Sequence, residues 1–116
     1  MTVPSLGGYT TETRIRLDDQ PDGPYLRVVF GLIPSPVWHR LCDMARDDAG
    51  TIGYDNHAAS FIAAGVTRIG DHLNEPVPLD PGDADTIANS YPPHIVTRIL
   101  VHIIRANTSG WSDPKD

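Results

Sequence analysis

The chain of 116 residues lacks several features that would narrow its class. Its single cysteine, Cys42, cannot form an internal disulfide, and an inert core thiol is favoured there over a reactive one. No apolar stretch approaches the ~18–20 residues that a helix needs to cross a bilayer, so no membrane partner is expected. The N-terminal sequence MTVPSLGGYT has neither the basic start nor the apolar run of a signal peptide, which predicts a cytoplasmic protein.

Basic residues are also scarce. Nine Lys and Arg stand against 15 Asp and Glu, and the net charge is −6. The cations are scattered along the chain, whereas a general nucleic-acid binder needs a basic face to neutralise phosphates. The sequence therefore predicts no nucleic-acid partner and leaves room for a protein partner with a basic surface.

The usual catalytic and metal-binding motifs are missing. The chain has no Gly-x-Ser-x-Gly elbow, and no Gly-Lys-Ser/Thr follows the stretch SLGGYT, so it is not a phosphate loop. His94 and His102 would lie about 12 Å apart along a helix, too far to share a metal ion. We therefore predict no catalytic residue, cofactor or metal site. A Ser-His-Asp triad assembled in space leaves no motif, so an enzyme remains open as the least favoured class.

The first third of the chain has the pattern of a β-hairpin. Residues 10–18 alternate between apolar and polar positions in their second half, with Ile15 and Leu17 against Arg14 and Arg16. Residues 25–32 alternate again, with Leu26, Val28 and Phe30 on one side. The stretch DDQPDGP between them is dense in turn-forming residues. Because a lone hairpin is marginal in water, it must pack on other elements.

Two helices are predicted in the middle of the chain. The first covers residues 36–47, with Ser35 as its N-cap and Pro36 at the first helical position. The second lies within residues 55–76, and its many Ala and Gly make it thin enough for close neighbours, so we place it at the centre of the packing. The residues expected on its apolar side are Phe61, Ile62, Gly65, Val66 and Ile69.

Two more helices are predicted near the C-terminus. A short one covers residues 81–89, capped by Asp80, with Asp83 in its first turn. Residues 91–108 divide into two halves on a helical wheel, which predicts an amphipathic helix with a basic polar face. The apolar half holds Ile95, Val96, Ile99, Leu100, Ile103, Ile104 and Ala106, and the polar half holds His94, Thr97, Arg98, Val101, His102, Arg105 and Thr108.

These elements together predict a mainly α fold with a short N-terminal β-hairpin (α+β), in which about four short helices form a compact bundle. A single globular domain is expected over residues 10–109. It would lie between a flexible N-terminus, residues 1–9, and a flexible C-terminal tail, residues 110–116.

Candidate partner-binding residues come from the polar face of the last helix and from two large aromatic side chains. The basic stripe suits an acidic partner, but a solvated helix face is the commoner explanation of such a pattern. The aromatic side chains are either core residues, which is more usual, or interface hot spots. The candidates are His94, Arg98, His102, Arg105, Trp38 and Phe61.

Four stretches follow one another within residues 25–108: VVFGLIPSPVWHRL, FIAAGVTRI, EPVPLDPGDADTI and YPPHIVTRILVHIIRAN. In this order they resemble the small tail assembly chaperones of long-tailed (siphovirus-type) phages of actinobacteria. The chain has Gly65 where bulkier residues are usual in that family. The matching residues are Leu32, Trp38, Leu41, Phe61, Ile62, Ala63, Ala64, Asp83, Ala84, Asp85, Pro93, Leu100 and Asn107.

The resemblance implies a non-enzymatic protein of the host cytoplasm. It would bind the tape measure protein, a long helical chain that sets tail length, and would help to recruit tail tube subunits around it. Self-association is expected, and the chain would be the short product of a gene that also gives a longer, frameshifted form.

Besides an enzyme, two other classes of protein remain open. One is a structural virion component, such as a connector or capsid accessory protein, retained in the mature particle. The other is an acidic antagonist that mimics the charge of DNA, although the spread of Arg through the chain argues against it.

Overall fold

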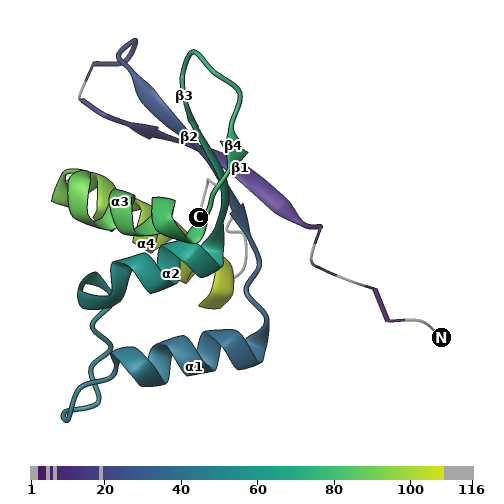
Figure 1. The fold of residues 1–116 in the computed structure, drawn as a ribbon, viewed down its shortest axis with the longest axis vertical. Coiled ribbons are helices and arrows are strands. Elements are labelled where there is room, and N and C mark those ends of the chain that lie inside the picture. Colours follow the sequence, from purple (N-terminus) through teal and green to yellow (C-terminus); the bar gives the residue numbers. More distant parts are fainter. Residues whose placement is uncertain (1–2, 5, 7, 19, 109–116) are drawn as a thin grey trace.

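The computed structural model describes residues 3, 4, 6, 8–18 and 20–108 (Figure 1). The strands are β1 (Thr10–Arg16), β2 (Tyr25–Gly31), β3 (Val66–Asp71) and β4 (Val77–Pro78). The helices are α1 (Ser35–Ala45), the short 3-10 helix η1 (Asp55–His57), α2 (Ala58–Gly65), α3 (Pro81–Ser90) and α4 (Pro93–Thr108). The predicted C-terminal tail, residues 110–116, lies outside the described residues, as does part of the predicted flexible N-terminus, residues 1–9.

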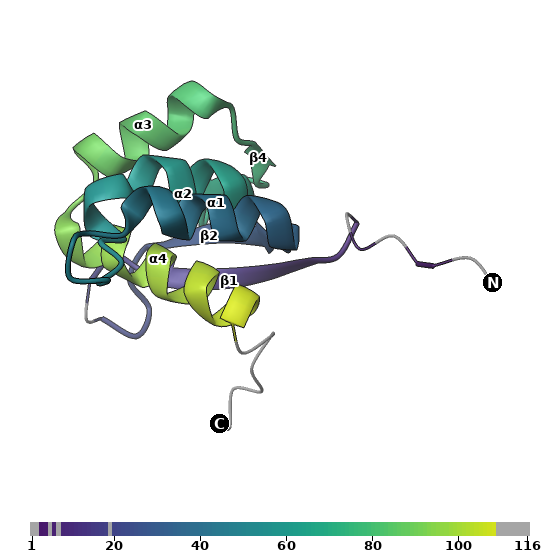
Figure 2. The same cartoon turned by 90° about the horizontal axis from the view of Figure 1, so that it is seen from below.

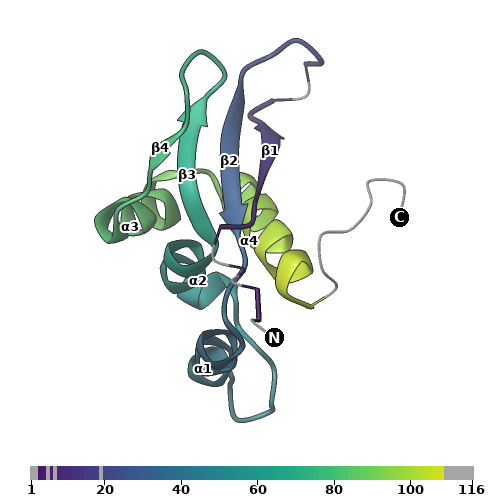
Figure 3. The same cartoon turned by 90° about the vertical axis from the view of Figure 1, so that its right-hand side faces the viewer.

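The four strands form one antiparallel sheet in the order β1–β2–β3–β4 (Figure 3). The predicted hairpin of β1 and β2 is confirmed, with Thr10 opposite Gly31 and Arg16 opposite Tyr25. The prediction of a mainly α fold, with a short N-terminal hairpin and a compact bundle of helices, is wrong. β3 and β4 extend the hairpin into a four-stranded sheet, so the fold is α+β with a substantial sheet.

The error arises from the helix predicted within residues 55–76, which ends at Gly65 and continues as β3. Val66 already has extended backbone angles, with φ −104° and ψ 122°. β3 then pairs with β2, and Ile69 lies opposite Val28. This pairing gives hydrogen-bond partners to the backbone N–H and C=O groups of β2 that point away from β1. The β-branched residues of the stretch VTRI also suit a strand. Tertiary pairing therefore outweighs a helical spacing that these residues also fit.

The ends of α1 also differ from the prediction. Pro34 occupies the N-cap position and no side chain caps the helix, so the predicted capping by Ser35 is wrong. The helix ends at Ala45, because Arg46 has an extended backbone and forms an isolated β-bridge with Ile52. The bridge turns the chain back and stops the helix before the predicted residue 47.

The predictions for α3 and α4 are confirmed. The capping box of α3 is present, and the Asp80 N–H donates to the Asp83 carboxylate at 3.0 Å. Along α4, the expected polar positions Arg98 and Arg105 are exposed. The buried residues of α4 are Ile95, Val96, Ile99, Leu100, Ile103 and Ala106, all from its predicted apolar half.

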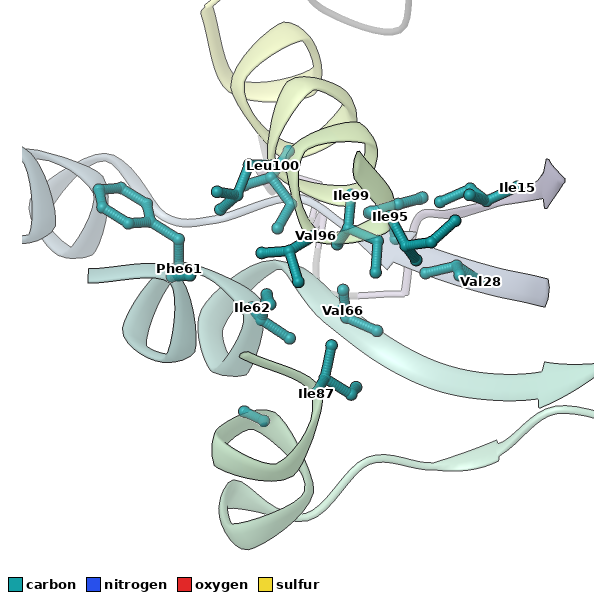
Figure 4. Packing of buried hydrophobic residues seen from close by; sticks show 14 of the residues in the cluster. Ile15, Val28, Phe61, Ile62, Val66, Ile87, Ile95, Val96, Ile99 and Leu100 are labelled. Carbon is teal, nitrogen blue, oxygen red and sulfur yellow. The ribbon is translucent and has the colours of Figure 1, made fainter. Parts of the chain in front are cut away.

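The core lies between one face of the sheet and helices α2, α3 and α4 (Figure 4). Ile95 and Ile99 of α4 lie beside Ile15 and Val28 of the hairpin (Figure 4). α2 lies centrally, in contact with α3 and α4. The largest side chains without exposed surface are Phe30, Phe61, Ile62, Ile95, Ile99, Ile103 and Val28.

At Gly65, the last residue of α2, the chain packs closely against Ile103 of α4. A Cβ atom there would lie 2.9 Å from both Cγ1 and Cγ2 of Ile103, a distance that real Cβ contacts essentially never show. The missing side chain therefore leaves the space that Ile103 fills. This agrees with the prediction that the thin helix sits at the centre of the packing.

Candidate functional site

The predicted basic stripe lies on the surface of α4, but only part of it is charged at neutral pH. His94, Arg98 and Arg105 are exposed, whereas His102 is half-buried with its ring centroid 5.4 Å from that of Phe30. Burial, together with the nearby Arg105 guanidinium, lowers the pKa of His102 below its ordinary value. The imidazole is therefore neutral at pH 7, and the two arginines carry the positive charge.

Arg98 does more than project into solvent. Its Nη1 donates a hydrogen bond to the backbone carbonyl of Arg16, at the end of β1, over 3.2 Å. This bond joins the first turns of α4 to the edge of the sheet. It brings the cations of the helix close to those of β1, a proximity that neither segment shows on its own.

Trp38 and Phe61 belong to one aromatic cluster with Tyr54. The rings of Trp38 and Phe61 meet edge to face with centroids 5.7 Å apart, and those of Tyr54 and Phe61 lie 5.1 Å apart. Phe61 is fully buried, so it has no surface to offer a partner. Trp38 is half-buried, so part of its side chain stays accessible.

This cluster attaches α1 to the rest of the domain. In the ribbon, α1 runs below α2 and apart from the sheet (Figures 1 and 3). The half-buried side chains of Val37, Trp38 and Leu41 reach back to the core and fill the space between. Cys42 lies on the same inward side, where burial raises the pKa of its thiol, so the sulfur is protonated at neutral pH.

A groove of about 630 Å³ lies where the segment between β2 and α1 meets the C-terminal end of α4. Asn107 forms part of its wall with both ends of its amide satisfied. Its Oδ1 accepts from the Ile33 N–H at 2.9 Å, and its Nδ2 donates to the Ile103 carbonyl at 2.7 Å. The groove therefore offers mainly apolar surface to a partner. Its lining residues are Leu6, Leu32, Ile33, Pro34, Ser35, Ala106 and Asn107.

The sequence alone does not reveal this groove. Ile33 and Asn107 are 74 positions apart, and only the folded chain brings them together. The available signal was the resemblance, which singled out Leu32 and Asn107 without showing that they meet.

The outer face of the sheet, away from the helices, carries arginine side chains. The register places Arg14 opposite Arg27, and Arg68 lies on the same face of the neighbouring strand β3. Arg27 is neutralised, since it makes a two-pronged contact with Glu12 at 3.1 and 3.2 Å and an ion pair with Glu75 at 3.5 Å. The positive charge of this face therefore comes from its other arginines.

Among the described residues, no three His, Cys, Asp or Glu side chains come close enough to hold a metal ion. The same residues contain no helix with the length and apolar character needed to span a membrane. The surfaces that the described residues offer to a partner include the groove, the outer sheet face and the edge where β1 meets α4.

Comparisons with protein-family models, with curated proteins and with solved structures find no match to this chain in any of the three.

Proposed function

We propose that this protein is a non-enzymatic tail assembly chaperone of a long-tailed phage. It binds the tape measure protein in the host cytoplasm and helps to recruit tail tube subunits around it. The observation that carries the proposal is the apolar groove beside Asn107, because two residues of the family resemblance, Leu32 and Asn107, line it together.

The groove suits one apolar stripe of a long amphipathic helix. Helix-in-groove binding needs apolar lining for the residues of the stripe and a rigid wall to orient the helix. Here Leu32 and the exposed Leu6 supply apolar surface, and the Ile33–Asn107 hydrogen bond fixes the wall. A tape measure protein repeats such stripes along its length and so offers many sites of this kind.

An assembly chaperone must also release its client. A shallow groove with few exposed apolar side chains gives a weak individual contact, since apolar binding scales roughly with the area removed from water. Many copies along one client raise the total affinity through multivalency. Displacement of single copies then remains easy when tube subunits arrive.

Other residues of the resemblance hold the domain together. Trp38 packs on Phe61, Leu100 lies in the core and Asp83 completes the capping box of α3. These roles give a physical reason for the family-like order of segments, which supports the proposal.

Co-expression with the tape measure protein from the same tail gene cluster tests the function. We expect the client to be recovered in soluble form only when the chaperone is present, as read by pull-down and light scattering. Leu32→Asp, in the groove, should abolish this recovery. The matched control is Leu73→Asp in the turn after β3, where the side chain is 79% exposed, and it should have no effect.

Failure of the wild-type protein to bind or solubilise the client would overturn the proposed function. Solubilisation that survives Leu32→Asp would leave the function and overturn the groove as its site. Mass spectrometry of purified particles provides a separate check, because a chaperone should be absent from the mature virion. Stoichiometric retention there would favour a structural component instead.

A further inference from the structure

The outer edge of β1 is an unpaired strand edge in the described part of the chain. β1 is the first strand of the sheet order, and β2 is its sheet neighbour. The Leu17 N–H donates to the Pro24 carbonyl at 3.0 Å. In an antiparallel pair, every second residue bonds to the partner strand, so this bond identifies which residues of β1 face β2 and which face away from it. Alternate residues Glu12, Arg14 and Arg16 therefore direct their backbone N–H and C=O groups away from β2. The Arg98–Arg16 hydrogen bond agrees, since it reaches that carbonyl from outside the sheet.

This edge has few of the features that usually block strand addition. β1 contains no proline, and its register with β2 is regular over all seven residues. Natural edge strands are commonly protected by proline, by bulges or by charged side chains. Charge is present here, in Glu12, Arg14 and Arg16, and charge selects among partners instead of excluding all of them. The Arg98 side chain also covers the Arg16 carbonyl, so the backbone groups of Glu12 and Arg14 are the ones left for an added strand.

Cationic side chains flank the edge on both sides. Arg14 and Arg16 lie on the outer face of the sheet, and Arg98 lies on the helix side within 3.2 Å of the Arg16 carbonyl. Figure 2 shows β1 and α4 next to each other along this border. Arg105 lies seven residues after Arg98, two turns further along the same face of α4. The one acidic residue of β1, Glu12, is already engaged by Arg27.

Most acidic side chains of the described residues lie elsewhere in the domain, although Asp18 and Asp22 in the turn between β1 and β2 follow Arg16 closely in the sequence. The segments from α1 to α3 outside β3 and β4 hold Arg40 and Arg46 as their only Lys or Arg residues. The border of β1 and α4 is therefore a cationic region on a chain of net charge −6, and it attracts anionic groups selectively. The acidic residues of these segments are Asp43, Asp47, Asp48, Asp55, Glu75, Asp80, Asp83 and Asp85.

We propose that the outer edge of β1 binds an extended acidic segment of a protein partner, which adds a fifth strand to the sheet. Main-chain hydrogen bonds to Glu12 and Arg14 would provide affinity, and carboxylates at alternate positions would pair with Arg14 and Arg16. Residues two apart in a strand share a face about 7 Å apart, so an alternating acidic segment matches the two arginines. The inference does not rest on the proposed function, because it uses the strand edge and not the groove.

A second copy of the chain is a poorer occupant of the edge. Pairing two β1 strands would bring the arginines of both copies, including Arg98, to one seam. Like charges opposite one another across strands are destabilising. The same arginines that oppose self-pairing therefore favour an acidic strand.

The test uses a fluorescein-labelled peptide of eight residues in which Glu and Val alternate, and a second peptide with Lys in place of Glu. We expect the Glu peptide alone to bind the full chain, with an affinity that falls several-fold as salt screens the charges. Amide exchange by NMR should show new protection at Glu12 and Arg14. Thr13 and Ile15, whose amides already face β2, serve as internal references.

Three variants locate the site. Arg14→Pro removes an edge-facing N–H while leaving the bonds from β1 to β2 intact, and proline is tolerated at such positions. Arg14→Glu with Arg16→Glu reverses the charge without changing the backbone. Each should weaken binding about tenfold or more, whereas Arg40→Glu on the exposed surface of α1 should not change it.

The double charge reversal keeps the test decisive if Arg14→Pro fails to fold. Equal binding of the Glu and Lys peptides would overturn the proposal. Binding of the Glu peptide that survives a folded Arg14→Pro would overturn strand addition. Protection of Glu12 and Arg14 in a peptide-free dimer would assign the edge to a second copy and overturn the acidic partner.

Discussion

The backbone N–H of Ile33 donates a hydrogen bond of 2.9 Å to the side-chain oxygen of Asn107, and so joins the end of the β2 segment to the last turns of α4. The Asn107 Nδ2 donates in turn to the Ile103 carbonyl at 2.7 Å. One side chain thus satisfies a loop donor and a helix carbonyl. The groove proposed for the client depends on this connection, because its walls are the two segments that Asn107 joins.

Asn107→Leu should destabilise the domain by about 1–3 kcal/mol, because it leaves the partly buried Ile33 N–H without a partner. Urea unfolding followed by circular dichroism measures the effect. Asn89→Leu, on the exposed surface of α3, is the matched control and should change stability by less than about 0.5 kcal/mol. Equal losses of unfolding free energy in the two variants would mean that the Ile33–Asn107 bond does not stabilise the domain.

Gly65→Ala should also destabilise the domain, although alanine is normally the better helix former. The added Cβ would lie 2.9 Å from two carbons of Ile103, whose side chain is buried and cannot move freely. Overpacking of this kind costs about 1–3 kcal/mol. Gly82→Ala in α3 is the control, since nothing lies within 4 Å of its added Cβ, and it should be neutral or slightly stabilising.

A double substitution separates overpacking from backbone effects at Gly65. Ile103→Ala alone should cost about 2–5 kcal/mol, because it leaves a cavity in the core. Combined with Gly65→Ala, the loss should be smaller than the sum of the two single losses, since the added methyl group then has room. Additive losses in thermal or urea unfolding would show that the contact with Ile103 is not the cause.

The sequence predicted those elements that are determined locally. The two sides of α4 separate on a helical wheel, and Asp80 with Asp83 specifies the start of α3. β3 could not be predicted in this way, because the spacing of Val66 and Ile69 fits a helix face, whereas a regular strand would place them on opposite faces. Only the β-bulge opposite Val29 and Phe30 brings both side chains to the core side of the sheet. The decision between helix and strand comes from pairing with β2, some 40 residues earlier in the chain. The run VVF in β2 was the available signal, since near-continuous burial suits a central strand better than the edge of a hairpin.

Among the candidate surfaces, too, only the features that depend on a single element could be predicted. The exposure of Arg98 and Arg105 follows from one helix and was predicted from its sequence. The burial of Phe61 against Trp38 and Tyr54 depends on contacts between separate elements. The groove and the β1 edge likewise require long-range pairing, so neither could be found from local patterns.

His102 should make the domain less stable in mild acid. Its pKa is lowered in the folded state by burial and by Arg105, so the unfolded chain binds a proton at a higher pH than the folded protein does. Stability is therefore fully present above the ordinary histidine pKa, near 6.5, and is lost as the pH falls below it. Thermal melting between pH 7.5 and 5 measures the loss.

His102→Gln removes this titrating group and should flatten the dependence of melting temperature on pH over that range. Thr97→Ala, at an exposed position of the same helix, should leave it unchanged. An unaltered pH dependence in His102→Gln would show that other groups cause the loss of stability in acid.

Trp38→Ala should loosen α1 while the rest of the domain stays folded. Trp38 contacts both Tyr54 and Phe61, and these rings are the main aromatic link between α1 and α2. Because Trp38 is half-buried, the free energy of opening α1 should fall by about 2–3 kcal/mol, below the ~3–5 kcal/mol typical of fully buried aromatics. Hydrogen exchange should show faster opening of amides in α1 and unchanged protection in α4.

Met44→Ala, at a position of α1 that is 47% exposed, is the control and should leave the exchange of both helices unchanged. If α1 and α4 lost protection together in Trp38→Ala, then α1 would belong to the same cooperative unit as the core, and the aromatic cluster would support the whole fold.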